Sequence, residues 1–241
     1  MQVLKFDKIP NTNSFLMELS KKGAKSWTVV WTSEQTDGRG YVNNRWVGEP
    51  GQNLAVSVLI KSNLEYSQLV FFNQWICISA QRILSRLGNE VFVKWPNDLI
   101  LDNKKIGGVL IQTRNTATGL DIITGIGLNI NQKEFEGIPK AGSLFSLTGR
   151  KFDVEEILSA LLTEMENSFE LIANKQWEMI SEIYHSRLYR RNEKCTFIKD
   201  SQQFEGTILG VNEKGELELK LSNGEIKQFI HKEIEMKEMK N

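Results

Sequence analysis

The decisive stretch of this sequence is KWPNDLILDNKKIGGVLI, residues 94–111. Two short apolar runs in it flank Asp102-Asn103, a pair that favours a tight β-hairpin turn. The hairpin would hold Lys104-Lys105 beside Gly107-Gly108, where the backbone lies open to a ligand. A cation beside open backbone suits an anionic small molecule, such as a carboxylate or a phosphate. A plain hairpin with solvated lysines is the alternative interpretation of the same residues.

A second segment, residues 34–46, connects two apolar runs that we expect to be strands. Arg39 lies between Gly38 and Gly40, so the backbone on both sides is free to fold the guanidinium over a bound anion. A loop that closes over a site excludes water from it. The alternative interpretation is a polar connecting loop that binds no ligand. The loop and the hairpin, considered together, favour the ligand-binding interpretation.

Together these segments make the chain resemble the biotin–protein ligases, enzymes that attach biotin to the carrier domains of carboxylases. The loop from Gly38 to Trp46 is similar to the family's glycine-arginine-glycine biotin loop, and residues 94–98 match its Lys-Trp-Pro-Asn-Asp signature in full. Lys105 and Gly108 fall where the family has its catalytic lysine and the glycine that follows. The resemblance covers nearly the whole chain. Two later segments also fit, Gly-Ile-Gly-Leu-Asn-Ile-Asn at 125–131 and Ser143-Leu144 followed by Gly149.

The composition fits a cytoplasmic enzyme. At 241 residues with 40% hydrophobic side chains, the chain can form one large domain, or one large and one small. Its 30 basic and 30 acidic residues cancel, so we expect no nucleic-acid or membrane partner. Cys77 and Cys195 lie far apart without metal-ligand spacing, which indicates buried thiols in a reducing compartment and no protein-held metal. The sequence shows no signal peptide and no apolar run long enough to span a bilayer.

The order of strands and helices predicts an α+β fold with a mixed, largely antiparallel sheet backed by helices. The resemblance implies the same architecture, that of the class II synthetase-like catalytic domain of biotin and lipoate ligases. Asn11 is the expected N-cap of a first helix. Further helices are expected at 66–87, 154–173 and 176–187, and strands at 3–6, 27–31, 54–60, 91–94, 99–101, 109–113 and 120–131.

The pattern changes near the end of the chain, and we expect a catalytic ligase domain at 1–189 and a second domain at 190–241. The second part consists of short predicted strands, in one of which Leu217 and Leu219 alternate with charged residues. Asn223-Gly224 is a tight-turn signal. This pattern, like the resemblance, indicates a small SH3-like β-barrel. A domain of about fifty residues has a marginal core, so the barrel should pack on the first domain and abut the active site.

The resemblance implies a reaction in two steps. Biotin and ATP give biotinyl-5'-AMP and pyrophosphate, and a lysine of a biotin carboxyl carrier domain then takes the biotinyl group. The biotin carboxylate must approach the α-phosphate, and two such charges at ~4 Å repel by about 4 kcal/mol at an effective dielectric constant of about 20. Lys105 is the expected catalytic cation that neutralises them, and Arg39 would brace the carboxylate and close the loop. Mg²⁺ would arrive with ATP, bound mostly through phosphates and water.

Biotin is expected to lie beside the start of the first helix. By the resemblance, Thr12 and Asn13 would bond the polar end of biotin, and helix capping is the alternative role for both. Asn11 stands where many family members have serine, and its amide would still be able to bond the ureido group. The residues expected around biotin are Asn11, Thr12, Asn13, Gln35, Gly38, Arg39, Gly40, Lys105 and Gly108.

The nucleotide is expected to meet Trp46 and Asn129, with Trp46 stacking on adenine. For Trp46 the alternative is packing in the core, and for Asn129 it is a buried amide that bonds the backbone. Asn97 and Asp98 are expected to orient the lysines and the loop rather than to bind substrate.

The sequence departs from the family pattern in the loop, where Tyr41-Val42-Asn43-Asn44 replaces a stretch rich in arginine and glycine. We expect Tyr41 and Arg45 to help retain the adenylate in place of the missing cation. The first strand begins almost at Met1, so the chain resembles the short form of biotin–[acetyl-CoA-carboxylase] ligase, without an N-terminal DNA-binding domain. The resemblance leaves a homodimer open.

Three other functions compete with this one. A lipoate–protein ligase shares the adenylate chemistry, but residues 94–98 argue against it. A non-catalytic biotin sensor would not need both Lys105 and Arg39. A transcriptional repressor would need a DNA-binding segment that the sequence does not display.

Overall fold

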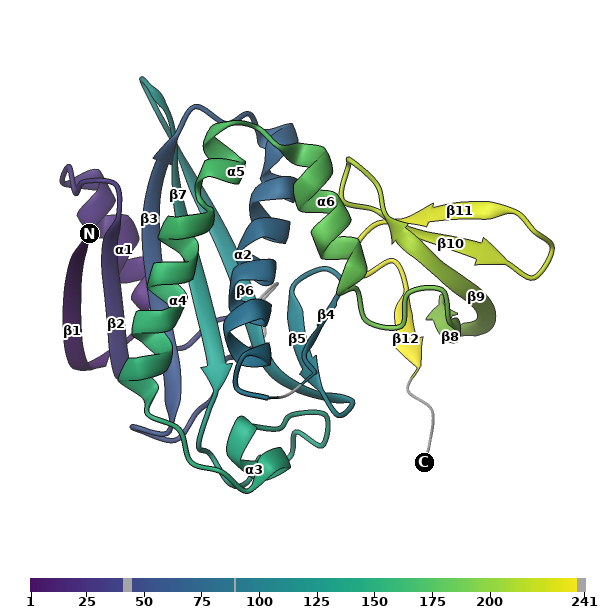
Figure 1. Cartoon of the computed structure of the whole chain (residues 1–241), viewed down its shortest axis with the longest axis horizontal. Coiled ribbons are helices and arrows are strands. Elements are labelled where there is room, and N and C mark those ends of the chain that lie inside the picture. Colours follow the sequence, from purple (N-terminus) through teal and green to yellow (C-terminus); the bar gives the residue numbers. More distant parts are fainter. Residues whose placement is uncertain (41–44, 89, 238–241) are drawn as a thin grey trace.

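The computed structural model describes residues 1–40, 45–88 and 90–237, which form two sheets with helices packed on the larger one (Figure 1). The larger sheet has seven strands in the order β1-β2-β3-β7-β6-β5-β4. Strands β1 and β2 run parallel, and the other neighbours pair antiparallel, which confirms the predicted mixed sheet. The strands are β1 (Gln2–Ile9), β2 (Thr28–Gln35), β3 (Asn53–Ser62), β4 (Phe92–Lys94), β5 (Asp98–Leu101), β6 (Lys104–Thr116) and β7 (Gly119–Asn129).

Helices cover both faces of this sheet. Helix α1 (Thr12–Lys21) packs against β2, β3 and β7, and α2 (Leu69–Ser85) packs on the other face against β4, β5 and β6. Consecutive residues of β2 show the two faces, because Val29 belongs to the large core with α2 whereas Val30 belongs to the small core with α1. Within the described ranges, no helix has the length and apolar composition needed to cross a bilayer. The other helical segments are η2 (Tyr66–Gln68), α3 (Leu144–Thr148), α4 (Val154–Ser168), α5 (Glu170–Ala173) and α6 (Trp177–Ser186).

The predicted hairpin is present. Leu101 pairs with Lys104 across the turn, and Asp102 and Asn103 have φ values of 46° and 60°. Asparagine and aspartate adopt this left-handed region more readily than most residues, which explains the choice of turn residues. The hairpin therefore fixes the start of β6, where Lys105 lies.

Two predicted helices differ from the structure at their ends. The helix expected at 66–87 begins with a 3-10 turn, in which the Gln68 N–H donates to Glu65 O at 2.9 Å, and its α-helical part ends at Ser85. The helix expected at 154–173 is divided at Phe169, whose N–H bonds three residues back to the Glu166 carbonyl.

The second sheet forms the predicted C-terminal barrel, with the strand order β11-β10-β9-β8-β12. Leu217 and Leu219 are buried, as their alternation predicts. The sequence pattern does not predict β12, a strand of 3 residues that pairs with β8. The strands are β8 (Lys194–Lys199), β9 (Gln202–Val211), β10 (Leu217–Leu221), β11 (Ile226–Phe229) and β12 (Glu235–Lys237).

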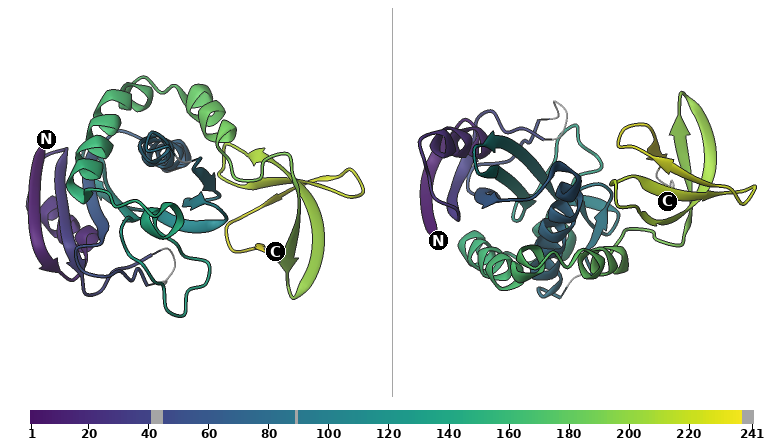
Figure 2. Two further views of the ribbon diagram at one scale, coloured as in Figure 1. Left: turned by 60° about the horizontal axis from the view of Figure 1, so that its bottom comes forward. Right: turned by 90° about the horizontal axis from the view of Figure 1, so that it is seen from above.

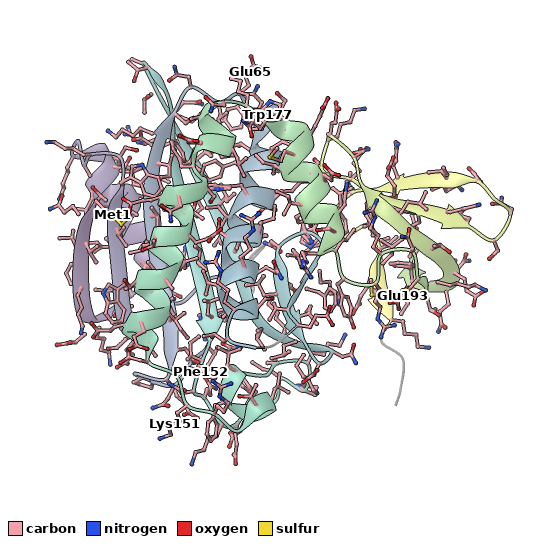
Figure 3. The ribbon with its side chains drawn as sticks, in the orientation of Figure 1. Met1, Glu65, Lys151, Phe152, Trp177 and Glu193 are labelled. Atoms are coloured by element: carbon pink, nitrogen blue, oxygen red, sulfur yellow. The ribbon has the colours of Figure 1, made fainter. Side chains whose placement is uncertain are left out.

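The barrel lies to one side of the larger sheet, next to α6 and β4 (Figure 2). The chain leaves α6 beside β4, where the Val93 N–H donates to Arg187 O and the Tyr189 N–H donates to Val93 O, both at 2.8 Å. It then passes Glu193 into the barrel (Figure 3). The division at residues 189 and 190 stays a prediction, but this short connection places the barrel against the strand that carries Lys94.

Candidate active site

A cavity of about 260 Å³ lies between the larger sheet, the start of α1 and the barrel. Nine of the eleven predicted site residues line it. The barrel contributes part of its wall, including His231 and Glu235. From the rest of the chain the lining includes Asn11, Thr12, Asn13, Gln35, Arg39, Gly40, Arg45, Trp46, Lys94, Trp95, Pro96, Asn97, Asp98, Lys105, Gly108 and Gly125.

One side of the cavity is built on a hydrogen-bonded network of Thr12, Asn13, Gln35 and Ser57. Gln35 Oε1 accepts from the Thr12 N–H at 2.8 Å and lies 3.1 Å from Thr12 Oγ1. The Ser57 hydroxyl lies 2.8 Å from Thr12 Oγ1 and 2.5 Å from Asn13 Oδ1, so its one proton can go to either. Thr12, Asn13 and Ser57 are buried and Gln35 is half-buried, and their mutual hydrogen bonds hold these polar groups in fixed directions.

Asn13 approaches the sheet closely because β7 carries a glycine there. Asn13 Nδ2 donates to Leu110 O at 3.2 Å and to Gln112 Oε1 at 3.1 Å, both on β6. A Cβ atom at Gly125 would lie 2.4 Å from Asn13 Oδ1, which is too close for any side chain. The cap of α1 is Asn11, whose side chain accepts from the Ser14 N–H at 2.9 Å. Asn11 is therefore the predicted N-cap, whereas Thr12 and Asn13 turn their side chains into the network.

The loop after β2 is closed at its base by Gly38 and Trp46. The Trp46 N–H donates to Gly38 O at 2.9 Å, and a Cβ at Gly38 would lie 2.4 Å from Trp46 O. The Trp46 indole lies on Gly127, where a Cβ would come within 2.6 Å of the ring. Trp46 is half-buried and lines the cavity, so a ring face is held beside it. The predicted role of Tyr41-Val42-Asn43-Asn44 concerns residues outside the described ranges.

Arg39 follows Gly38 at the base of this loop and lines the cavity. Its guanidinium is paired with Asp37, with Nη2 and Oδ2 2.8 Å apart, and the side chain is largely exposed. An exposed ion pair of this kind contributes about 0–1 kcal/mol, so exchange of Asp37 for another anion costs little.

Lys105 lies opposite, on β6 immediately after the hairpin turn. Its backbone is held on both sides, because the Lys105 N–H donates to Lys140 O at 2.8 Å and the Gly142 N–H donates to Lys105 O at 3.0 Å. Its Nζ lies 2.5 Å from Asp98 Oδ1 on β5. A Cβ at Gly108 would have ordinary contacts at 3.5 Å, and Gly108 lines the cavity, so a side chain there would take up space meant for a ligand.

Asn97 fixes this part of the hairpin and supports the predicted orienting role. Its Nδ2 donates to Val109 O at 2.6 Å, and the Val109 N–H donates back to Asn97 O at 3.0 Å. The preceding Trp95–Pro96 peptide bond is cis, and Asn73 Nδ2 donates to Pro96 O at 2.9 Å. These contacts hold the segment from Trp95 to Asp98 as a rigid wall.

The barrel is attached to this wall. Trp95 Nε1 donates to Gly215 O at 2.9 Å, and the Trp95 ring meets the His231 ring edge-on at 5.6 Å. Nearby, His185 Nε2 accepts from the Val211 N–H at 2.9 Å. Burial lowers the pKa of both histidines, and neighbouring cations (Arg191 near His185, Lys232 and Lys105 near His231) lower it further. Both histidines of the chain therefore lie at the junction and favour the neutral form.

Two of the predicted residues do not line the cavity. Gly38 lies at the base of the loop, where it contacts Trp46. Asn129 is buried and its Nδ2 donates to Gly142 O at 2.9 Å, as the alternative interpretation expects. Its Oδ1 is also buried and has no hydrogen-bond partner within the described ranges. Its predicted contact with the nucleotide stays a prediction.

Sequence reasoning missed Ser57 and the particular barrel residues. Ser57 has a visible signal, because it is the one hydroxyl in the apolar run 54–60. His231 and Glu235 have none, because their approach to the cavity depends on how the barrel docks. Among the residues that the structure describes, no group of three or more His, Cys, Asp or Glu side chains could hold a metal.

Comparison with known proteins identifies the class. Residues 3–129 match the biotin/lipoate A/B protein ligase family, and residues 192–236 match the biotin protein ligase C terminal domain. The chain belongs to the biotin/lipoate A/B protein ligase family. Within that family, the C-terminal match marks an enzyme of the biotin protein ligase type.

The relatives agree with this placement. The chain is 25% identical over 238 residues to the bifunctional ligase/repressor BirA of Bacillus spizizenii, covering 95% of this chain and 72% of that protein. It is 24% identical over 219 residues to the biotin–[acetyl-CoA-carboxylase] ligase of Paracoccus denitrificans, covering 87% and 90%. The structure of the Aquifex aeolicus biotin protein ligase in complex with biotin and ATP superimposes with a TM-score of 0.82 at 23% identity, covering 99% of both chains. At that identity the likeness confirms the fold.

Proposed function

We propose that this protein is an ATP-dependent biotin–protein ligase that makes biotinyl-5'-AMP and pyrophosphate, then transfers biotin to a lysine of a biotin carboxyl carrier domain. The observation that carries the proposal is one cavity that joins a fixed polar network to Lys105 and Arg39. The names of the Paracoccus ligase and of the Aquifex complex with biotin and ATP support the same substrates.

In the first step, the network of Thr12, Asn13, Gln35 and Ser57 receives the polar end of biotin. Gln35 Oε1 is engaged by Thr12, which leaves its Nε2 to donate to the ligand. Because buried polar groups are costly to leave unpaired, a ligand that completes this set is selected over one that does not. The network thus fixes the position of the carboxylate at the other end of the molecule.

Lys105 then neutralises the negative charge that accumulates where the biotin carboxylate meets the α-phosphate. Its ammonium exchanges the Asp98 carboxylate for the biotin carboxylate and the α-phosphate, and Arg39 exchanges Asp37 in the same way. A biotin carboxylate oxygen attacks the α-phosphorus, and pyrophosphate leaves. Removing a repulsion of about 4 kcal/mol accounts for about three powers of ten in rate.

In the second step, the neutral amine of the carrier lysine attacks the acyl carbon of the adenylate. The bond from that carbon to the phosphate oxygen breaks, an amide forms, AMP leaves with the electron pair, and the amine releases a proton. Lys105 is placed to stabilise the phosphate as it leaves. No side-chain nucleophile is required.

ATP fits the remaining contacts. Trp46 lines the cavity with its indole packed on Gly127, so adenine would stack on this ring. The described residues offer no acidic cluster to hold a metal, so Mg²⁺ would be bound mostly by the triphosphate and water. When bound, it neutralises phosphate charge. Both cysteines are free and buried, which fits the cytoplasm as the proposed location.

Mass spectrometry of a biotin carboxyl carrier domain tests the proposal. The domain is incubated with the protein, MgATP and either biotin or lipoate. We expect a mass increase of one biotinyl group, lost when the acceptor lysine is replaced. A lipoyl product would identify a lipoate ligase instead. Absence of both product and biotin-dependent pyrophosphate release would identify a non-catalytic biotin-binding protein.

A further inference from the structure

Most of the charged side chains that line the active-site cavity are basic. Among the described residues of its lining, the acidic side chains are those of Asp98 and Glu235, and the basic ones are those of Arg39, Arg45, Lys94 and Lys105. These cations suit the anionic substrates of the first proposed step. The second step brings in a lysine side chain, which is positively charged at pH 7 because its ordinary pKa is about 10.4. The cavity therefore has to receive a cation beside its own cations, which an acidic side chain would favour.

Glu235 is the more accessible of the two acids. The Asp98 side chain is 30% exposed and its Oδ1 lies 2.5 Å from Lys105 Nζ, whereas the Glu235 side chain is 72% exposed. The backbone of Glu235 is held in strand β12, where it pairs with Ile198 of β8. Glu235 thus presents an accessible carboxylate from a fixed position in the barrel wall of the cavity.

A lysine ammonium already lies at this carboxylate. Lys140 Nζ is 3.5 Å from Glu235 Oε1, and both side chains are largely exposed. An ion pair of this kind is held weakly, so another ammonium group can take the place of Lys140 at little cost. The Lys140 carbonyl accepts the Lys105 N–H at 2.8 Å, so the ion pair adjoins the segment that fixes the backbone of Lys105. A second lysine at Glu235 would therefore arrive near the start of β6, which carries Lys105.

We propose that Glu235 receives the positively charged acceptor lysine of the carrier domain, in exchange for Lys140, before biotin is transferred; this inference rests on the proposed function. The ammonium then gives one proton to water, and the neutral amine attacks the acyl carbon of the adenylate as in the second step above. An ion pair stabilises the ammonium and not the amine, so Glu235 favours binding of the carrier rather than the chemical step. Glu235 is thus a specificity-determining residue for a cationic acceptor.

Steady-state biotinylation of a carrier domain by the full chain, with saturating biotin and MgATP, tests this proposal. Glu235→Gln keeps the size of the side chain and removes its charge, so the KM for the carrier should rise about threefold, with the effect in KM rather than in kcat. Lys140→Met removes the competing ammonium, so this KM should stay equal or fall. Glu225→Gln is the matched control and should behave like the wild type, because Glu225 is an exposed, ion-paired residue of the barrel outside the cavity lining.

Hydroxylamine provides a second measurement, because it also takes the biotinyl group from the adenylate but is uncharged at neutral pH. Glu235→Gln should lower transfer to the carrier relative to transfer to hydroxylamine, again by a factor of about three. An equal loss with both acceptors would overturn the proposal. An equal rise of KM in Glu235→Gln and Lys140→Met would also overturn it, because the ion pair would then serve to hold the barrel in place.

The wild type separates the two levels of inference. If it does not biotinylate the carrier, the proposed function fails and this inference fails with it. If the wild type biotinylates the carrier and Glu235→Gln has the same KM, the proposed function stands and only the role of Glu235 is overturned.

Discussion

The two sides of the active-site cavity are held in opposite ways. Thr12, Asn13 and Ser57 are at most 4% exposed and bond to each other and to Gln35, whereas the Lys105 and Arg39 side chains are 39% and 63% exposed and paired to carboxylates. A buried network is costly to rearrange, so it recognises one fixed ligand shape. Exposed ion pairs exchange at little cost, so the cations can move from aspartate to substrate. Under the proposed function, the cavity thus combines a rigid side for recognition with an exchangeable side for catalysis.

The largest effect that this comparison predicts is at Lys105. Lys105→Met keeps the length of the side chain and removes its charge, so biotin-dependent pyrophosphate exchange should fall about a thousandfold. Circular dichroism should show an unchanged fold. Lys104→Met is the control, because Lys104 Nζ donates to Pro139 O at 2.5 Å outside the cavity lining, and it should keep nearly full activity. Near-normal exchange by Lys105→Met would remove the catalytic side from the comparison.

A smaller effect is expected at the network. Ser57→Ala leaves Thr12 and Asn13 without their shared donor, at a cost of about 1–3 kcal/mol, so the KM for biotin should rise about tenfold or more with kcat little changed. Thr124→Val is the matched control, because the Thr124 hydroxyl is buried without a partner among the described residues. If both variants raise KM equally, the network has no special part in recognition.

A third prediction concerns the pH dependence of stability at the junction between the barrel and the larger sheet. The pKa values of His185 and His231 are lowered in the folded protein, so the unfolded state binds protons more readily as pH falls below the ordinary value of about 6.5. The free energy of unfolding should therefore decrease as pH falls from 7 through the lowered pKa values. Urea unfolding at several pH values measures this. The double variant His185→Gln, His231→Gln should show a shallower dependence, and an unchanged slope would exclude the two histidines as its source.

The smallest effect is expected at Asp37. Asp37→Asn removes the competitor for Arg39, and because the pair is exposed, the KM for biotin should change by less than about threefold. Arg39→Gln should raise it clearly more. A large effect of Asp37→Asn alone would show that this ion pair is structural, and the two sides of the cavity would then differ less than we infer.

The parts of this site that sequence predicts are those determined locally. The hairpin at Asp102-Asn103, the cap at Asn11 and the glycines around Arg39 each follow from a few adjacent residues, and the structure contains all three features. Motif resemblance added Lys105 and Gln35, which do line the cavity.

The parts that sequence does not predict depend on contacts between distant residues. Ser57 meets Asn13 across 44 positions, and Trp95 meets Gly215 across 120. Asn129 makes a contact that local sequence does not predict either, because its Nδ2 donates to Gly142 O. Local patterns do not encode how the barrel docks. They therefore identify residues of the site but not the barrel residues that complete the cavity wall.

The barrel wall of the cavity has a consequence for the order of synthesis. The last residues that line the cavity are His231, Ile234, Glu235 and Met236, and a ribosome makes them after every other lining residue. A nascent chain that already carries Lys105 and the network of Thr12, Asn13, Gln35 and Ser57 thus lacks one wall of the cavity until residue 236 has been made. Under the proposed function, the residues that would bind biotin are therefore made before the cavity that encloses them is complete.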